Sequence, residues 1–299
     1  MGSNTMQYSI VVPVYNSSKT LPVLFEELQA VMDKIGAEYE VVFVDDCSSD
    51  TSWEVLKSIR SGNDHVRILR LANNVGQWMA TLAGIRKTTG ALVITIDDDL
   101  EYETGDIELL IREYHRSDAY LIYGIPVEKK NKNLSYKIFF KARDRFLRIF
   151  FDKIQTESFK IFKREIYFDK TGTMFSHLHF EAYTKFTVSK KYVSHVDVNY
   201  RKRYFGNSNH TLLMKAAIMI KYGIEYYRSP FKYPLYMMFA LILLYFAGLF
   251  LHFNMNIFLL IEFMIAMLLL LVIGISGKYL SSLYFKLKGL PEYVVVEEY

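Results

Sequence analysis

Three consecutive aspartates follow a short apolar stretch in the first half of the chain. The segment "VITIDDDLEYE" at 93–103 places Asp97, Asp98 and Asp99 directly after β-branched residues. Neighbouring carboxylates repel one another, so a cluster of this kind needs a cation or hydrogen-bond donors to offset its charge. Carboxylate oxygens suit Mg²⁺ or Mn²⁺ better than zinc. Aspartate runs also form turns and helix caps, so the run alone leaves both interpretations open.

Polar side chains also end two other apolar stretches of this half of the chain. Tyr15 and Asn16 follow "YSIVVPV", and Asp45 and Asp46 follow "EVVFV". The carboxyl ends of the strands in an open parallel sheet line its ligand-binding crevice. We therefore expect three separate strands to direct polar groups at one site.

Five stretches of the first 125 residues are nearly continuous in β-branched and apolar residues, which is typical of buried parallel strands. They cover residues 8–16, 40–46, 66–71, 91–99 and 119–125. Helical spacing of apolar residues separates the first two stretches, at Leu21, Leu24, Leu28 and Val31. A second helix is expected around Met79, Leu82 and Ile85, ending at Gly90. The alternation predicts an α/β fold, a mostly parallel sheet with helices on both faces.

Composition narrows the class of protein. Of 299 residues 51% are hydrophobic, and the net charge is only +4. Cys47 is the only cysteine, which excludes intrachain disulfides and cysteine-rich zinc sites and is compatible with a reducing compartment. A basic stripe with base-stacking aromatic residues is the sign of nucleic-acid binding, and membrane contact explains the basic, aromatic segment of this chain better. We therefore expect no nucleic-acid partner.

The C-terminal part is strongly apolar. Residues 233–261 contain no Asp, Glu, Lys or Arg, and after Glu262 another uncharged stretch covers 263–277. A membrane-spanning helix needs about 20 apolar residues, so two spans are expected at 233–253 and 257–275, joined by a turn at 254–256. Lysines and arginines flank this hairpin on both sides and are absent from its turn, which predicts cytoplasmic termini at the inner (cytoplasmic) membrane. The alternative is a buried helical hairpin of a soluble protein.

Two further segments combine basic and apolar residues. Residues 129–164 mix Lys and Arg with Phe, Ile and Leu, and residues 211–230 precede the expected spans. Basic amphipathic helices of this composition suit an anionic membrane surface. The alternative is a pair of packed helices with a solvated basic side. The predicted organisation is a cytoplasmic domain at 1–228, a transmembrane hairpin at 229–277 and a cytoplasmic tail at 278–299.

Four segments in sequence order resemble family 2 glycosyltransferases of the GT-A fold, a Rossmann-like α/β fold. They are "VVPVYN" (11–16), "VFVDDCSSDTS" (42–52), "NNVGQWMATLAGIRKTTGALVITIDDDLE" (73–101) and "RYFGNSNHT" (203–211). Within that family the chain looks like the polyprenyl-phosphate branch, which includes dolichol-phosphate mannose synthases, bactoprenol glucosyltransferases and undecaprenyl-phosphate aminoarabinose-type transferases. The resemblance is strong over residues 8–125, thins through 126–195 and returns at 200–211.

The resemblance implies roles for particular residues. The nucleotide sugar would lie against Pro13, Tyr15, Asn16, Asp45, Asp46, Gln77, Asp97 and Asp98. The metal ion, Mg²⁺ or Mn²⁺, would be held by Asp97, Asp99 and Glu101. Phosphate groups would be held by Arg203, Ser208, Asn209 and Lys160. Asp99 and Arg203 would act in catalysis, and which of Asp45 and Asp46 touches the base stays open.

Three positions depart from the pattern of the family. Asn209 stands where the family typically has Lys, Ile125 where an Arg is common, and Glu101 where Gln is usual. The missing positive charge has several candidate replacements, at Lys129, Lys130, Lys132 and Lys137. For each of these lysines a solvated surface position is the better interpretation.

The resemblance implies inverting transfer of a sugar from a UDP- or GDP-linked donor to a polyprenyl (undecaprenyl) phosphate at the cytoplasmic face of the membrane. A phosphate acceptor is already anionic at neutral pH and needs no dedicated base. Two alternatives are transfer to another lipid such as diacylglycerol, and a catalytically idle, membrane-tethered binding protein of the same fold. The expected partners are the nucleotide sugar, the lipid phosphate and the bilayer, with homo-oligomers as a further expectation.

Overall fold

The computed structural model describes residues 7–127, 157–168, 188–201, 241–242, 245, 255–287 and 293–299. The chain divides into two compact units. The first comprises Met1–Asn209 and Glu292–Tyr299, and the second comprises His210–Pro291. The last residues of the chain therefore belong to the same unit as its N-terminal half.

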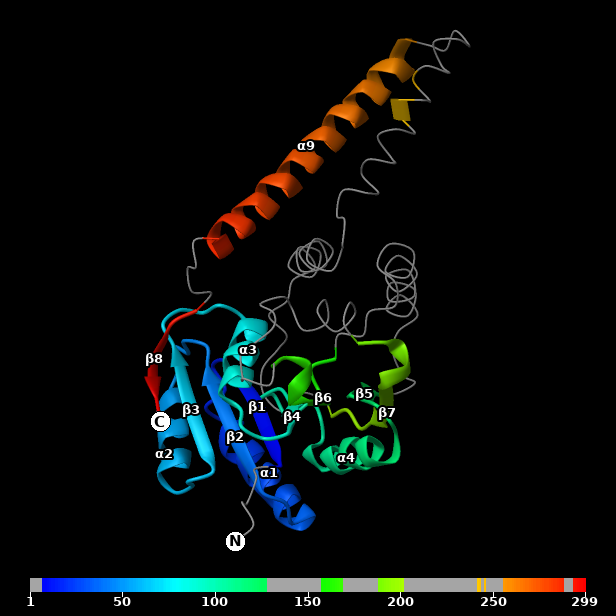
Figure 1. Cartoon of the computed structure of the whole chain (residues 1–299). Coiled ribbons are helices and arrows are strands. Elements are labelled where there is room, and N and C mark those ends of the chain that lie inside the picture. The colour runs from blue at the N-terminus through cyan, green and yellow to red at the C-terminus, as the bar shows by residue number, and fades with distance from the viewer. Residues whose placement is uncertain are drawn as a thin grey trace. The chain divides into compact units, whose positions relative to one another are not determined.

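The first unit is built on an eight-stranded sheet in the order β7-β5-β6-β4-β1-β2-β3-β8 (Figure 1). The strands are β1 (Tyr8–Val14), β2 (Tyr39–Asp45), β3 (Val66–Leu71), β4 (Leu92–Thr95), β5 (Leu121–Pro126), β6 (Lys160–Lys163), β7 (Val193–Val198) and β8 (Val295–Glu298). Strands β1, β2, β3 and β4 run parallel to one another, and β5 runs parallel to β7. Strand β6 is antiparallel to β4 and β5, and β8 is antiparallel to β3.

Helices cover both faces of this sheet, as the alternation in the sequence predicts (Figure 1). One face packs against α1 (Leu21–Ile35), α2 (Ser52–Ser61) and α4 (Ile107–Arg116), and the other packs against α3 (Gln77–Lys87). Alternate residues of β1 enter the two cores, Val12 the first and Val11 the second. Because side chains of a strand point to opposite faces in turn, a strand buried on both sides reads as a continuous apolar run.

The five predicted strands and both predicted helices are confirmed, with small shifts of their ends. Helix α1 accepts Pro22 in its first turn and ends at Gly36, whose φ of 70° suits glycine. The prediction for Gly90 is wrong, because α3 already ends at Lys87. A Cβ at Gly90 would lie 2.8 Å from the backbone nitrogen of Ser9, so this glycine permits a close approach of two backbone segments.

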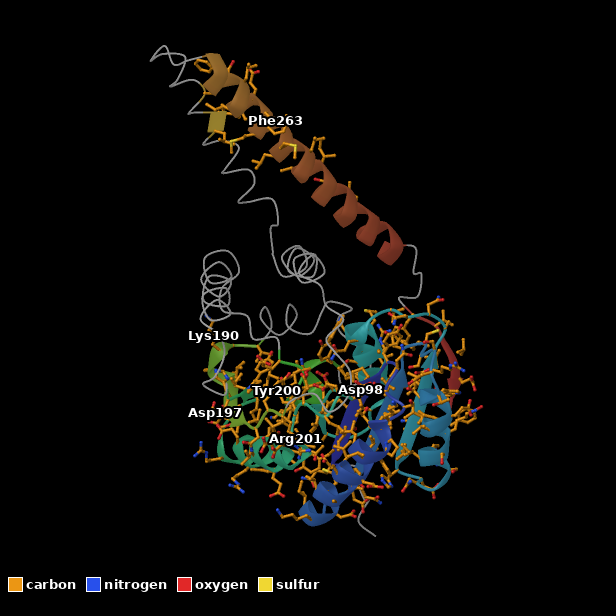
Figure 2. The ribbon with its side chains drawn as sticks, turned by 180° about the vertical axis from the view of Figure 1, so that it is seen from behind. Asp98, Lys190, Asp197, Tyr200, Arg201 and Phe263 are labelled. Atoms are coloured by element: carbon orange, nitrogen blue, oxygen red, sulfur yellow. The ribbon has the colours of Figure 1, made fainter. Side chains whose placement is uncertain are left out.

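The second unit contains α9 (Met255–Leu287), a helix of 33 residues that includes the predicted span at 257–275. Phe263, Leu270 and Ile273 are among its exposed apolar side chains (Phe263 is labelled in Figure 2). Among the residues that the structure describes, no helix combines the length and the apolar character that crossing a bilayer requires. A two-helix transmembrane hairpin is therefore not found there, and most of the other predicted span, 233–253, lies outside the described residues.

Candidate active site

The three aspartates lie just beyond the end of β4, in the centre of the sheet. Asp97 accepts two side-chain hydrogen bonds, from Gln77 Nε2 at 2.5 Å and from Ser158 Oγ at 2.6 Å. Gln77 is the first residue of α3, and Ser158 precedes β6. Three elements that are distant in sequence thus meet at the Asp97 carboxylate.

Asp98 joins the end of β4 to the end of the neighbouring strand β1. Its Oδ2 accepts a hydrogen bond from the backbone nitrogen of Tyr15 at 3.1 Å. The Tyr15 side chain is 50% exposed, whereas Pro13 is buried within β1. A tyrosine ring exposed beside a carboxylate cluster has room to stack on a planar ligand.

Asn16 connects the ends of β1 and β2. Its side-chain Oδ1 accepts hydrogen bonds from the backbone nitrogens of Ser49 at 2.8 Å and Asp50 at 3.3 Å. Its own backbone nitrogen donates to Ser48 Oγ at 2.9 Å. The residue has a φ of 55°, a left-handed conformation that asparagine tolerates better than most residues. Asn16 therefore orders the loop between β2 and α2, because its side-chain Oδ1 accepts hydrogen bonds from the backbone of that loop.

Asp45 and Asp46 are both buried, with 0% and 2% exposure. The carboxylate of Asp46 accepts hydrogen bonds from the backbone nitrogens of Val75 and Gly76, both at 2.8 Å. These two bonds hold the turn that leads into α3. Asp45 Oδ1 accepts a hydrogen bond from the backbone nitrogen of Ser48 at 3.3 Å. Each of these carboxylates therefore has a role in the loops that surround the site.

Glu101 lies farther along the same turn and contacts a segment from the other end of the unit. Its Oε2 accepts a hydrogen bond from the hydroxyl group of Tyr200, and its backbone oxygen accepts one from Arg201 N at 2.7 Å. Arg201 also pairs with Glu27 of α1 at 2.9 Å (Tyr200 and Arg201 are labelled in Figure 2). Residues 200–201 are thus docked beside the aspartates.

The electrostatics of the cluster favour a bound cation. Burial, with smaller contributions from the charges of Asp99 and Asp98, raises the pKa of Asp97 to about 7 although the hydrogen bond from Ser158 lowers it. Burial and the charge of Asp99 also raise the pKa of Asp98 to about 6. The buried Lys160 in β6 acts in the opposite direction on Asp97, because its positive charge favours the ionised carboxylate. One lysine does not cancel the repulsion among the aspartate carboxylates. A divalent ion bound between them would offset it.

The residues present fit a metal ion shared with a phosphorylated ligand better than an ion held by protein alone. Among the described residues, no group of three or more His, Cys, Asp or Glu side chains has an arrangement that holds a metal. Mg²⁺ is commonly bound through one or two carboxylates together with substrate phosphates. Asp97 and Asp99 meet this requirement. The predicted third ligand, Glu101, has its Oε2 at the Tyr200 hydroxyl group.

Part of the predicted site lies outside the described residues, namely Arg203, Ser208 and Asn209, as do residues 129–156 and 211–230 of the predicted surface helices. The helix predicted at 129–164 is wrong at its end, because Lys160–Lys163 form β6, paired with β4 and β5 in the sheet. Sequence reasoning missed the contacts of Ser158 and Tyr200. Ser158 has no motif around it, and only its place just before β6 brings it to Asp97. Tyr200 lies three residues before Arg203, which is the only signal in the sequence that marks it.

Solved structures that are similar to this chain identify its fold class. A crystal structure of glucosyl-3-phosphoglycerate synthase from Mycobacterium tuberculosis, in complex with Mn²⁺ and UDP-glucose, superposes with a TM-score of 0.54 at 13% identity, over 74% of this chain and 77% of that chain. Mannosyl-3-phosphoglycerate synthase from Rubrobacter xylanophilus gives a TM-score of 0.53 at 15% identity, over 72% of each chain. Together with the sheet order, these likenesses establish a Rossmann-like GT-A fold.

The family follows from the sequence. The model of glycosyl transferase family 2 matches residues 9–192, so the chain belongs to that family. An undecaprenyl-phosphate 4-deoxy-4-formamido-L-arabinose transferase from Pectobacterium atrosepticum is 35% identical over 47% of this chain and 42% of its own length. Its counterpart from Pectobacterium carotovorum is 29% identical over 71% of this chain and 64% of its own length. The chain therefore spans between two fifths and two thirds of these relatives.

Proposed function

We propose that this protein transfers a sugar from a nucleoside-diphosphate sugar to a polyprenyl phosphate, with inversion at the anomeric carbon. The observation that carries the proposal is the meeting of β1, α3 and the start of β6 at the Asp97–Asp99 cluster beyond β4, in a member of glycosyl transferase family 2. The names of the curated relatives supply the acceptor class, undecaprenyl phosphate. The similar synthase from Mycobacterium tuberculosis, solved with UDP-glucose, supports a uridine nucleotide as the first donor to test.

The nucleotide sugar would lie across the ends of β1, β2 and β4. In this proposal the exposed ring of Tyr15 stacks on the nucleoside, and Gln77 and Asp98 contact the sugar or the diphosphate. Pro13, Asn16, Asp45 and Asp46 support this pocket from β1 and β2. Arg203, Ser208, Asn209 and Lys160 would hold phosphate oxygens, for which the fork of an arginine is well suited.

A divalent ion between Asp97 and Asp99 would bind the diphosphate and offset the charge that develops on it as it leaves. Glu101 completes the proposed ligand set if it exchanges its contact with Tyr200 for the ion. The acceptor phosphate is already ionised, so the protein has to orient it and exclude water rather than remove a proton. Side chains that hold the two phosphorylated groups are therefore the expected catalytic machinery, with Asp99 and Arg203 at its centre.

We further propose that the protein works at the cytoplasmic face of a membrane. The support is the set of exposed apolar side chains on α9, which includes Phe263, Leu270 and Ile273. The apolar segment at 233–253, the basic segments at 129–156 and 211–230, and a lipid-linked acceptor agree with this placement. The two-span hairpin at 229–277 is part of the proposal, as are the cytoplasmic domain at 1–228 and the tail at 278–299.

The experiment is a transfer assay with purified full-length protein, Mn²⁺ and radiolabelled UDP-, GDP- and dTDP-sugars. The acceptors are undecaprenyl phosphate and diacylglycerol, and the products are separated by thin-layer chromatography. We expect a labelled lipid with undecaprenyl phosphate alone, and no product from Asp99→Asn. Product with diacylglycerol alone would replace the acceptor in the proposal. Absence of both transfer and hydrolysis with every donor would instead favour the catalytically idle binding protein of the same fold.

A further inference from the structure

Asp45 at the end of β2 is a buried carboxylate with an incomplete set of hydrogen bonds. Its side chain has 0% exposure, and among the described residues its Oδ2 has no hydrogen-bond partner. The group that faces this oxygen is the guanidinium of Arg70 in β3, with Nε at 3.4 Å. A buried carboxylate without compensation is costly, and burial raises the pKa of Asp45. The hydrogen bonds from Ser48 and the positive charge of Arg70 oppose that shift, and Arg70 is the group that faces Oδ2.

Arg70 is itself held by the C-terminal strand. Its Nη1 lies 3.4 Å from Oε1 of Glu297, the residue of β8 that stands opposite it in the antiparallel register. Its guanidinium carbon lies 5.6 Å from the centre of the Trp53 ring. Strand β8 runs along the outer edge of the sheet beside β3 (Figure 1). Arg70 therefore bridges the last residues of the chain and the end of β2.

The contacts continue from Asp45 to the aspartate cluster. The backbone nitrogen of Ser48 donates to Asp45, and its hydroxyl oxygen accepts from the backbone nitrogen of Asn16. The preceding residue, Tyr15, donates its backbone nitrogen to Asp98. An unbroken series of contacts thus runs from Glu297 to the centre of the site.

We propose that Arg70, oriented by Glu297 of the C-terminal strand, is a positioning residue for the nucleotide pocket. It acts by fixing the Asp45 carboxylate and, through Ser48, the loop that joins β2 to α2. Neither Arg70 nor Glu297 needs to touch the ligand. The inference rests on the proposed function, because it assumes that a nucleotide lies against this loop.

The chain offers a matched control for Glu297. Glu298, the next residue of β8, pairs with Lys87 at 2.6 Å and with Arg67 at 3.8 Å. Neither of those residues contacts Asp45 in the described structure. Neutralising Glu298 therefore weakens the attachment of β8 without changing the surroundings of Arg70.

The experiment compares Glu297→Gln, Glu298→Gln and Arg70→Met in the full chain with Mn²⁺ present. Affinity for UDP is measured by calorimetry, and backbone hydrogen exchange of residues 45–50 by mass spectrometry. A partly exposed ion pair is weak, so we expect about a two- to fivefold loss of UDP affinity in Glu297→Gln. The loss should exceed about tenfold in Arg70→Met, which removes the positive charge that faces the buried Oδ2 of Asp45. Exchange at 45–50 should rise in both variants, and Glu298→Gln should match the wild type.

Equal effects of Glu297→Gln and Glu298→Gln on affinity and on exchange would overturn the inference. They would show that β8 acts only as an edge strand of the sheet and has no specific effect through Arg70. Unchanged exchange at 45–50 in Arg70→Met would overturn it as well. Failure of the proposed function has a different signature. In that case the wild-type protein binds none of UDP, GDP and dTDP, and the nucleotide part of the inference fails with it. Raised exchange in Glu297→Gln alone would then still establish the coupling between β8 and the loop.

Discussion

At the scale of single residues, the carboxylates around the site differ in what donates to them. Asp46 accepts two backbone amides that cannot move away without unfolding the turn before α3. Among the described residues, the hydrogen bonds to the Asp97 carboxylate come from the side chains of Gln77 and Ser158, which can rotate to release it. Backbone donors indicate a structural carboxylate, whereas side-chain donors leave a carboxylate available to a ligand. The two groups therefore respond differently to neutralisation.

Asp46→Asn should destabilise the protein. The asparagine amide group would face one of the two backbone nitrogens, so at least one buried hydrogen bond is lost, at a cost of about 1–3 kcal/mol. Urea denaturation followed by circular dichroism measures the loss. Full stability combined with weaker nucleotide binding would instead assign Asp46 to the ligand, as a contact to the base.

Asp97 should make the stability of the metal-free protein depend on pH. Its pKa in the folded protein is about 7, above the ordinary value of 3.8. At a pH between these two values, the folded protein therefore keeps a proton on Asp97 that the unfolded chain has lost. Stability from this group is therefore full below the ordinary value and falls as the pH rises through about 7. Melting curves in EDTA from pH 5 to 8 should decline more steeply for the wild type than for Asp97→Asn.

Addition of Mn²⁺ at pH 8 is the companion measurement. An ion bound between Asp97 and Asp99 stabilises the ionised carboxylates, so the melting temperature of the wild type should rise and that of Asp97→Asn should not. Asp64→Asn is the control, since that carboxylate is fully exposed and remote from the cluster. Parallel pH curves for the wild type and Asp97→Asn would contradict the assignment of the raised pKa.

At the scale of elements, the close packing of α3 on the sheet places Gln77 at the aspartates. Gly84 of this helix lies so near β1 that an added Cβ would meet Val11 Cγ1 at 2.5 Å and Val44 Cγ2 at 3.0 Å. Both valines lie in the core beneath α3. A side chain at position 84 would therefore push the helix away from the strands that carry the site.

Gly84→Ala should cost stability and catalytic rate together. Overpacking of a well-packed core costs about 1–3 kcal/mol, more than the gain of about 1 kcal/mol from the better helix propensity of alanine. Gly62→Ala at the end of α2 is the matched control, because nothing lies within 4 Å of its Cβ. Thermal melts and transfer rates test both variants, and equal melting temperatures would contradict the tight contact of α3 with β1.

At the scale of the whole molecule, the two units differ in the surfaces that they expose. The apolar residues of the first unit lie mainly in the two cores of the sheet. Helix α9 of the second unit instead exposes 64% of Phe263, 64% of Leu270 and 64% of Ile273. A helix that exposes several large apolar side chains needs a covering partner, and lipid is the partner that the proposed function requires.

Replacing Leu270 and Ile273 together by Lys should reduce binding to phospholipid vesicles, because two charges would enter the apolar surface of α9. Sedimentation with vesicles of the composition of a bacterial inner membrane measures the bound fraction. The control variant replaces Val23 and Val127 by Lys, two exposed apolar residues of the first unit. Equal binding of the two variants would argue that α9 does not contact lipid.

Local patterns were sufficient to predict much of this protein. Runs of β-branched residues marked β1 to β5, the spacing of Leu21, Leu24 and Leu28 marked α1, and the ordered motifs indicated the family. These features depend on neighbours in sequence, because burial on both faces of a strand or on one side of a helix imposes a fixed period. The placing of the aspartates at a strand end followed from the same patterns.

Contacts between distant segments were decided only by the tertiary structure. Strands β6, β7 and β8 are too short or too polar to stand out, and each is a strand because a neighbour in the sheet offers unpaired backbone groups. The partners of Asp45, Asp97 and Glu101 come from residues 20 to 99 positions away. No local pattern encodes such pairs, because long-range packing determines which side chains share one low-dielectric pocket.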